Sequence, residues 1–188
     1  MNKDRLILIT NPGSSSRKYA LYRGNDFLCS LHFEFEGKKV IYTLKKLDGS
    51  KEKRETKLKD LSFVVNNLEE ILAREGYLEG ATKLDAILAR VAAPGGYFAT
   101  DHIVDEECLK QLDIAKERAP LHAPVIASEI EQLRKVFKET LIIAISDSAF
   151  HNDRSEVAKS YAIDTELAQK FDIQRWGYHG LSVGSIVR

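Results

Sequence analysis

The sequence predicts an α/β protein whose mixed sheet has an antiparallel edge and flanking helices. Three extended segments follow one another closely at the start of the chain, at residues 5–10, 18–23 and 26–33. Two later apolar segments, residues 85–91 and 141–145, are separated by stretches with helical periodicity. Strands joined by short turns favour antiparallel pairing, and strands joined by helices favour parallel pairing. The order of the elements therefore predicts both kinds of pairing in one sheet.

The first turn of the chain links the first two predicted strands. Pro12 presets φ and Gly13 accepts a positive φ, so the backbone can reverse there. An apolar run at residues 19–22 follows at once. This pattern predicts a β-hairpin.

The other elements follow from periodicity and from residues that begin or end helices. Apolar residues at helical spacing predict helices, Asp105 is a good N-cap and Gly76 a stop signal. The segments are a strand at 39–47, a solvated loop or strand end at 48–56, a helix at 61–75, strands at 85–91 and 141–145, helices at 105–116 and 125–137, short helices at 156–161 and 164–170, and the start of a helix at 178–188.

Composition narrows the class of protein. The chain has 188 residues with 28 Lys and Arg against 28 Asp and Glu, and this balance argues against a broad electrostatic nucleic-acid binder. Its two cysteines, Cys29 and Cys108, give neither a disulfide framework nor a zinc site and are expected to be buried thiols. No segment has the apolar length of a membrane span or the features of a signal peptide. We therefore expect a soluble cytoplasmic protein with no nucleic-acid or membrane partner.

Three polar groups follow predicted strands at the point where each strand ends. They are residues 11–16, Arg90 and Asp147. Ligands of α/β sheets bind at the carboxyl ends of the strands. Their convergence predicts a catalytic cleft at this edge of the sheet.

Each of these groups has a chemical and a structural interpretation. Ser14, Ser15 and Ser16 offer hydroxyls and N–H groups beside Lys18, which suits a phosphate, although the same residues suit a polar hairpin turn. Arg90 can clamp a carboxylate or phosphate, or form a structural ion pair.

The acidic residue and the two histidines also have two interpretations each. Asp147 can help to hold a divalent cation, or cap the next helix. His122 lies in a proline-bracketed turn and His179 precedes Gly180. A histidine in such a turn is either a catalytic group or a satisfied structural one.

Four motifs together resemble those of one family, the acetate and propionate kinases. They occur in the family's order and at about its spacing. They are Asn11-Pro-Gly-Ser-Ser-Ser with Lys18, Ala119-Pro-Leu-His-Ala-Pro, Asp147-Ser-Ala-Phe-His151 and Arg175-Trp-Gly-Tyr-His-Gly-Leu-Ser182. The resemblance covers nearly the whole chain and corresponds to the first half of such a kinase.

This resemblance implies a ribonuclease-H-like domain of the actin, sugar-kinase and Hsp70 type. It implies reversible, Mg²⁺-dependent phosphoryl transfer between ATP and acetate, giving acetyl phosphate and ADP, in a protein that forms a homodimer. Residues 1–188 then correspond to a single amino-terminal acyl-kinase-like domain, and the second, nucleotide-binding domain is absent from the chain. We therefore expect the isolated chain to have little or no kinase activity and to be able to self-associate through its exposed cleft surface.

The resemblance also implies roles for individual residues. The catalytic residues are Asp147, His179 and Arg90, and the ligands of Mg²⁺ are Asn11 and Asp147. The expected phosphate-binding residues are Asn11, Gly13, Ser14, Ser15, Ser16 and Lys18. The expected substrate-binding residues are Asn11, Arg90, Ala92, Leu121, His122 and Tyr178.

The chain departs from the family pattern after its arginine strand. The family usually continues into Val-His-Gly-Gly, whereas this chain reads Arg90-Val-Ala-Ala-Pro-Gly-Gly96. Ala92 replaces a usually bulkier residue and Tyr178 a usual Phe, which predicts a larger or more polar pocket that accepts propionate beside acetate. Two alternatives stay open, a propionate or butyrate kinase and a non-catalytic binding module of the same fold.

Overall fold

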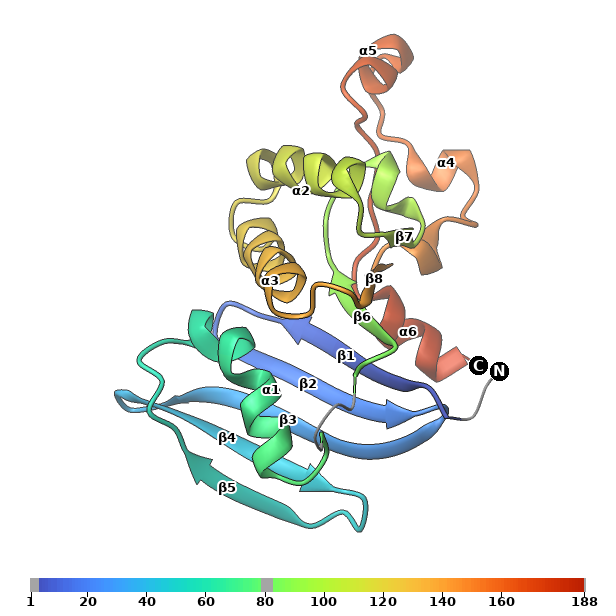
Figure 1. Ribbon diagram of the computed structural model, residues 1–188. Helices are drawn as coiled ribbons and strands as arrows, with labels where there is room; N and C mark the ends of the chain where they lie inside the picture. The colour runs from blue at the N-terminus through green and yellow to red at the C-terminus, as the bar shows by residue number, and fades with distance from the viewer. Residues whose placement is uncertain (1–3, 79–82, 188) are drawn as a thin grey trace.

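The computed structural model describes residues 4–78 and 83–187 and contains one mixed sheet flanked by helices (Figure 1). The strand order is β5-β4-β3-β2-β1-β6-β8-β7. β1 to β5 pair antiparallel, β1, β6 and β8 pair parallel, and β7 pairs antiparallel with β8. The predicted fold class is thus confirmed, with antiparallel pairing at both edges of the sheet.

The antiparallel part consists of the first five strands. They are β1 (Leu6–Pro12), β2 (Ser16–Arg23), β3 (Asp26–Glu36), β4 (Lys39–Lys46) and β5 (Lys51–Glu55). The predicted hairpin is present, with Pro12 opposite Arg17 and Asn11 opposite Lys18. Residues 48–56 were predicted to be a solvated loop or a strand end. The structure shows a strand there, since β5 pairs with β4 along its length. Its charged, exposed residues suit the edge of a sheet, where they discourage pairing with other chains.

The parallel part holds short, apolar strands beside β1. They are β6 (Ala86–Val91) and β8 (Leu141–Ser146), with β7 (His102–Ile103) at the edge. After β6 the chain breaks at the predicted Pro-Gly-Gly, where Gly95 has a φ of 117°. β7 was not predicted, because two residues are too few to show a period.

The helices agree with their predicted positions to within a few residues. The longer ones are α1 (Val64–Arg74), α2 (Glu106–Arg118), α3 (Ala123–Val136) and α6 (Gly180–Val187). The short ones are α4 (Glu156–Lys159), α5 (Thr165–Lys170) and the 3₁₀ turns η1 (Leu61–Phe63), η2 (Gly96–Ala99) and η3 (Ala149–His151). The predicted helix at 178–188 begins at Gly180, and its last residue lies outside the described residues.

The core lies between the sheet and the helices α1 and α3. Figure 1 shows α1 over the antiparallel strands and α3 beside the turn between β1 and β2. Inward residues alternate along the strands and pack on the apolar helix faces, as Leu8, Phe33, Leu68 and Ile130 illustrate. Cys29 and Cys108 are both buried, as expected. In the part of the chain that the structure describes, no helix has the length and apolar character needed to cross a membrane.

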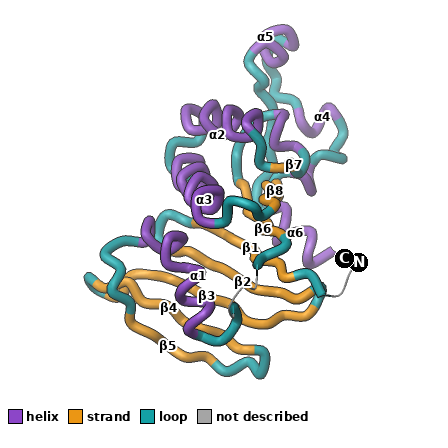
Figure 2. Tube along the Cα trace, in the orientation of Figure 1, coloured by secondary structure: helices purple, strands orange, loops and turns teal. Residues whose placement is uncertain are grey.

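The chain between β8 and α6 leaves the body of the molecule and returns to it. Figure 2 shows this stretch as loop with short helical turns, in contrast to the continuous strands of the sheet. Phe150 in η3 packs against Gly184 in α6, so the two ends of the stretch meet. This contact places residues 147–151 and 177–184 side by side at the carboxyl ends of the parallel strands.

Candidate active site

A hollow of about 390 Å³ lies at the carboxyl ends of the parallel strands. Its walls come from the β1–β2 turn, the ends of β6 and β8, the first turn of α3 and the residues before α6. The lining residues are Pro12, Gly13, Ser14, Ser15, Arg90, Ala92, His122, Val125, Ile126, Asp147, Tyr178 and His179. Most residues that the sequence singled out therefore meet in one place.

Arg90 joins the ends of three strands. One guanidinium nitrogen, Nη1, donates to Oδ1 of Asn11 at 3.1 Å, and the other, Nη2, donates to Oδ2 of Asp147 at 2.7 Å. Arg90 ends β6, Asn11 is near the end of β1, and Asp147 follows β8. The structural ion pair is therefore present, and the guanidinium also lines the hollow.

Asp147 is buried and its carboxylate accepts several donors. Besides Arg90, the N–H groups of His179 and Leu181 donate to it, at 2.8 and 3.4 Å. Burial is the largest single influence on its pKa and raises it, but the hydrogen bond from Arg90, the N–H of His179 and the charge of Arg90 outweigh burial and hold the pKa below its ordinary value. Asp147 is thus a carboxylate at neutral pH, and it caps the amino-terminal end of α6 rather than that of the next helix.

The segment before α6 is shaped to meet Asp147. His179 has a φ of 61°, an uncommon value for a residue with a side chain. The N–H of Gly180 donates to the carbonyl oxygen of Asp147 at 2.9 Å. A Cβ atom on Gly180 would lie 2.3 Å from that oxygen, so only glycine fits. These constraints hold His179 and Tyr178 at the hollow.

The turn between β1 and β2, residues 13–16, is here called the serine turn. The N–H of Gly13 donates to the carbonyl oxygen of Ser16 at 2.9 Å and closes it. Ser14 and Ser15 line the hollow, but Ser16 does not. The predicted hairpin turn and the predicted polar concavity are therefore the same structure.

Besides Ser16, three predicted site residues do not line this hollow, namely Asn11, Lys18 and Leu121. Lys18 is exposed on the open face of the sheet and lines a separate shallow hollow of about 240 Å³ with Asn11. Leu121 is 79% exposed and does not line the hollow. Ala92 and His122 do line it, and His122 immediately precedes α3.

Sequence reasoning missed the apolar wall formed by Val125 and Ile126. A signal existed, because Pro124 occupies the first turn of α3 and fixes where that helix begins. Residues three and four positions after His122 then lie on the same side of the helix as His122. This wall gives the hollow an apolar side opposite its charged groups.

The oxygen donors of the site suit a hard cation. Asp147 supplies a carboxylate and Asn11 an amide oxygen, and Mg²⁺ commonly binds one or two such groups and completes its shell with water and phosphate. Both oxygens bond to Arg90 in the described structure. Within residues 4–78 and 83–187, no three His, Cys, Asp or Glu side chains cluster as metal ligands. The donor set therefore fits a cation that is shared with a bound phosphate.

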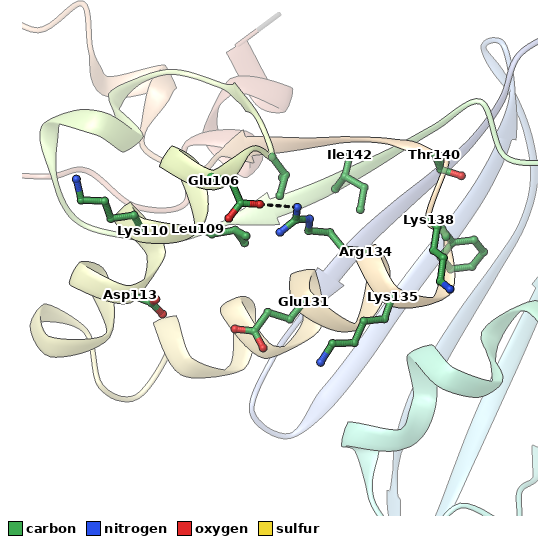
Figure 3. A pocket seen from close by; sticks show the side chains of 12 residues that line it. Glu106, Leu109, Lys110, Asp113, Glu131, Arg134, Lys135, Lys138, Thr140 and Ile142 are labelled. Carbon is green, nitrogen blue, oxygen red and sulfur yellow. Dashed lines mark hydrogen bonds and ion pairs between the residues drawn. The ribbon is translucent and has the colours of Figure 1, made fainter.

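A wider hollow, of about 900 Å³, lies between α2, α3 and the edge of the sheet. Figure 3 shows acidic and basic side chains spread along it, and Arg134 donates to Glu106 there at 2.8 Å. None of the predicted site residues lines it. Its open shape and dispersed charges distinguish it from the smaller hollow, where polar groups converge.

Comparison with known proteins assigns the family. The sequence profile described as Acetokinase family matches residues 6–187. The chain belongs to the acetokinase family. It is 32% identical over 178 residues to an acetate kinase of Campylobacter lari and 29% identical over 178 residues to one of Oceanobacillus iheyensis. Each match covers 94% of this chain and 45% of the relative.

A solved structure of an acetokinase-family relative gives the same result. A propionate kinase from Francisella tularensis subsp. tularensis superposes with a TM-score of 0.81 at 29% identity, over 94% of this chain and 45% of that protein. The expected actin-like fold is thus confirmed. The chain spans about 45% of the length of the curated relatives it matches, and it corresponds to their amino-terminal part.

Proposed function

We propose that this acetokinase-family chain carries the carboxylate- and phosphate-binding part of a cytoplasmic acetate kinase. Such an enzyme transfers a phosphoryl group reversibly between ATP and acetate, giving acetyl phosphate and ADP. The observation that carries the proposal is Arg90, which lines the hollow while bonded to both Asn11 and Asp147. Residues 1–188 form the amino-terminal domain in this proposal, and the adenosine pocket belongs to a second domain.

Each group has a task that suits its chemistry. The Arg90 guanidinium binds the carboxylate of the acid or the phosphoryl oxygens of the acyl phosphate. Ser14 and Ser15 offer hydroxyls and backbone N–H groups to the phosphoryl group, and Gly13 closes the turn that presents them. His179 neutralises charge that develops on that group. Phosphoryl transfer asks for positioning and charge stabilisation rather than covalent chemistry, which this arrangement supplies.

Mg²⁺ is part of the proposal because its expected ligands lie together. Asp147 and Asn11 would hold the ion, which supplies neutralisation of the phosphate charge when it is bound. The lowered pKa of Asp147 supports this assignment, since a ligand of Mg²⁺ must be ionised.

We also propose that the pocket accepts propionate beside acetate. The hollow has an apolar wall from Val125 and Ile126, and the small Ala92 leaves room beside it. Turnover of acetate, propionate and butyrate by a longer form of the protein tests this, and strict preference for acetate would refute it.

Exposed apolar side chains support self-association of the chain and a homodimer of the longer form. Val157, Leu167 and Phe171, on the stretch that carries α4 and α5, are all exposed. A large exposed apolar surface is typical of an interaction site. Sedimentation velocity over a range of concentrations tests the proposal, and a concentration-independent monomer would refute it for this chain.

The main test is trapping of acetyl phosphate as its hydroxamate, with ATP, Mg²⁺ and acetate. It is run on the 188-residue chain and on any longer form of it. We expect activity in the longer form and little in the chain alone. In the longer form, Arg90→Met should lower turnover by about 10²–10³-fold, the cost of losing one charge-stabilising donor. Arg134→Met, which breaks an arginine pair in the other hollow, is the matched control. Silence of both forms would favour the non-catalytic binding module.

A further inference from the structure

Three buried polar side chains lie directly behind the serine turn. Arg17 and Tyr19 are on the inward face of β2, and Glu129 is in the middle of α3. Their exposed fractions are 7%, 2% and 3%. The Tyr19 hydroxyl donates to Oε1 of Glu129 at 2.7 Å, and Nε of Arg17 lies 3.2 Å from Oε2. We call these residues the Arg17 cluster.

Arg17 reaches from this cluster to the backbone of the serine turn. Its Nη1 donates to the carbonyl oxygen of Gly13 and, at 3.3 Å, to that of Ser16. The first and last carbonyls of the turn are thus both bound on the inner side. Among the described residues, no acceptor binds the N–H of Ser14 or Ser15, which stand beside the hollow.

We propose that Arg17, held in place by Glu129 and Tyr19, is a positioning residue that orders the serine turn to bind an anionic phosphoryl group. Arg17 binds the carbonyl oxygens that would repel an anion and so leaves the N–H groups and hydroxyls of the turn to meet it. The inference rests on the proposed function, because it names how that function's phosphate site is built. Lys18, the next residue, cannot do this, since it lies on the opposite face of β2.

The charges of the cluster depend on one another. Nε of Arg17 has no hydrogen-bond partner among the described residues, so its contact with Glu129 is an ion pair. Burial raises the pKa of Glu129, and the Tyr19 hydroxyl and the Arg17 charge oppose that rise. Removing one member leaves a buried polar group without its partner, whereas replacing both charges together is often neutral for stability.

Replacing both charges together therefore tests the positioning role of Arg17 without a large loss of stability. The double variant Arg17→Met/Glu129→Gln removes both charges and should keep the unfolding midpoint of the wild-type chain within a few degrees. Sodium phosphate is titrated into the 188-residue chain, and the amide NMR signals of Ser14 and Ser15 report binding. We expect about tenfold or more weaker binding, because phosphate must then order the turn itself; tenfold corresponds to about 1.4 kcal/mol.

A second cluster of the same three residue types provides the matched control. Tyr42 donates to Glu75, and Arg74 donates to the Tyr42 hydroxyl at 3.0 Å. This cluster lies on β4 and the end of α1, away from the serine turn. The variant Arg74→Met/Glu75→Gln should leave phosphate binding unchanged. If Arg17→Met/Glu129→Gln fails to fold, Tyr19→Phe takes its place, with a smaller weakening in the same direction.

The outcomes separate this inference from the proposed function. A folded Arg17 variant that binds phosphate as tightly as wild type would overturn the inference even if the longer form makes hydroxamate. A wild-type chain whose Ser14 and Ser15 signals do not respond to phosphate would overturn it as well. Weaker binding in the variant, with no hydroxamate from any form, would support the inference and contradict the proposed function.

Discussion

The ion pairs around the candidate site differ from those at the antiparallel edge of the sheet. Asp147, which follows β8, and Glu129, in the middle of α3 behind the serine turn, are nearly inaccessible, and each carboxylate contacts an arginine and at least one further donor. In the antiparallel part, the pairs Lys39–Glu55 and Lys53–Glu36 are exposed. Buried pairs fix geometry because a lost partner leaves a buried charge, whereas exposed pairs are screened and contribute little. The buried charges therefore have a structural role, whereas the exposed charges only keep an edge strand soluble.

Replacing Asp147 should have the largest effect. In Asp147→Asn one carboxylate oxygen becomes an NH₂ group, which cannot accept a hydrogen bond. The remaining oxygen can face Arg90 and the N–H of His179, but the N–H of Leu181 then loses its acceptor and Arg90 loses its charged partner. We expect the free energy of unfolding to fall by about 3 kcal/mol, as for a hydrogen bond to a charged group. Urea denaturation measures this, with the exposed Asp153→Asn as control. Equal stability of the two variants would mean that burial of Asp147 does not matter.

The substitution Gly180→Ala tests the backbone packing of the same region. The added methyl group of Gly180→Ala would meet the carbonyl oxygen of Asp147, which cannot move aside. Overpacking of this kind costs about 1–3 kcal/mol. Gly184→Ala is the comparison, since its Cβ would lie 3.1 Å from the movable Phe150 ring. Thermal unfolding should rank Gly180→Ala below Gly184→Ala, and the reverse order would contradict the described contact.

The acid dependence of stability should also trace to Asp147. Its pKa is lower in the folded chain than its ordinary value, so its contribution is present above the ordinary pKa and is lost as pH falls through the lowered one. Wild type and Asp147→Asn should therefore become more alike in unfolding free energy as pH falls through that range. A difference that stays constant between neutral and acid pH would argue against an ionised Asp147.

The smallest effect is expected on the antiparallel side. Lys53→Met removes an exposed partner of Glu36. We expect the free energy of unfolding to change by less than about 1 kcal/mol, with a further decrease of the effect in high salt. A loss as large as that of Asp147→Asn would contradict the contrast between the buried pairs of the site and the exposed pairs of the edge.

Much of the fold could be predicted because its signals are local. The helical spacing after Leu61 and the N-cap at Asp105 each act within one element, and each is confirmed. The hairpin at the Pro-Gly turn is also confirmed, but Gly13 closes it without the expected positive φ. The polar strand ends also converge as the parallel topology requires. The roles assigned to their side chains stay predictions.

Whether a predicted site residue lines the hollow depends on which way its side chain faces. Arg17 and Lys18 are adjacent cations, and the resemblance favoured Lys18. The alternation of Tyr19 and Leu21 with Arg17 would have placed Arg17 inward. The resemblance implied that Leu121 binds substrate, but Leu121 lies in the exposed link before α3. No local pattern predicts how such a link is oriented.

The contact between η3 and the stretch before α6 affects which parts of this fold can change in length and sequence. A Cβ on Gly177 would lie 2.2 Å from the His151 ring, and His151 also contacts the Tyr178 carbonyl oxygen at 3.0 Å. The two ends of the stretch that carries α4 and α5 are therefore held in contact beside the hollow. Loop length costs little once the ends are fixed, since the closure entropy grows only slowly with length. Insertions, deletions and substitutions in that stretch can therefore accumulate during evolution without changing the geometry of Asp147 and His179.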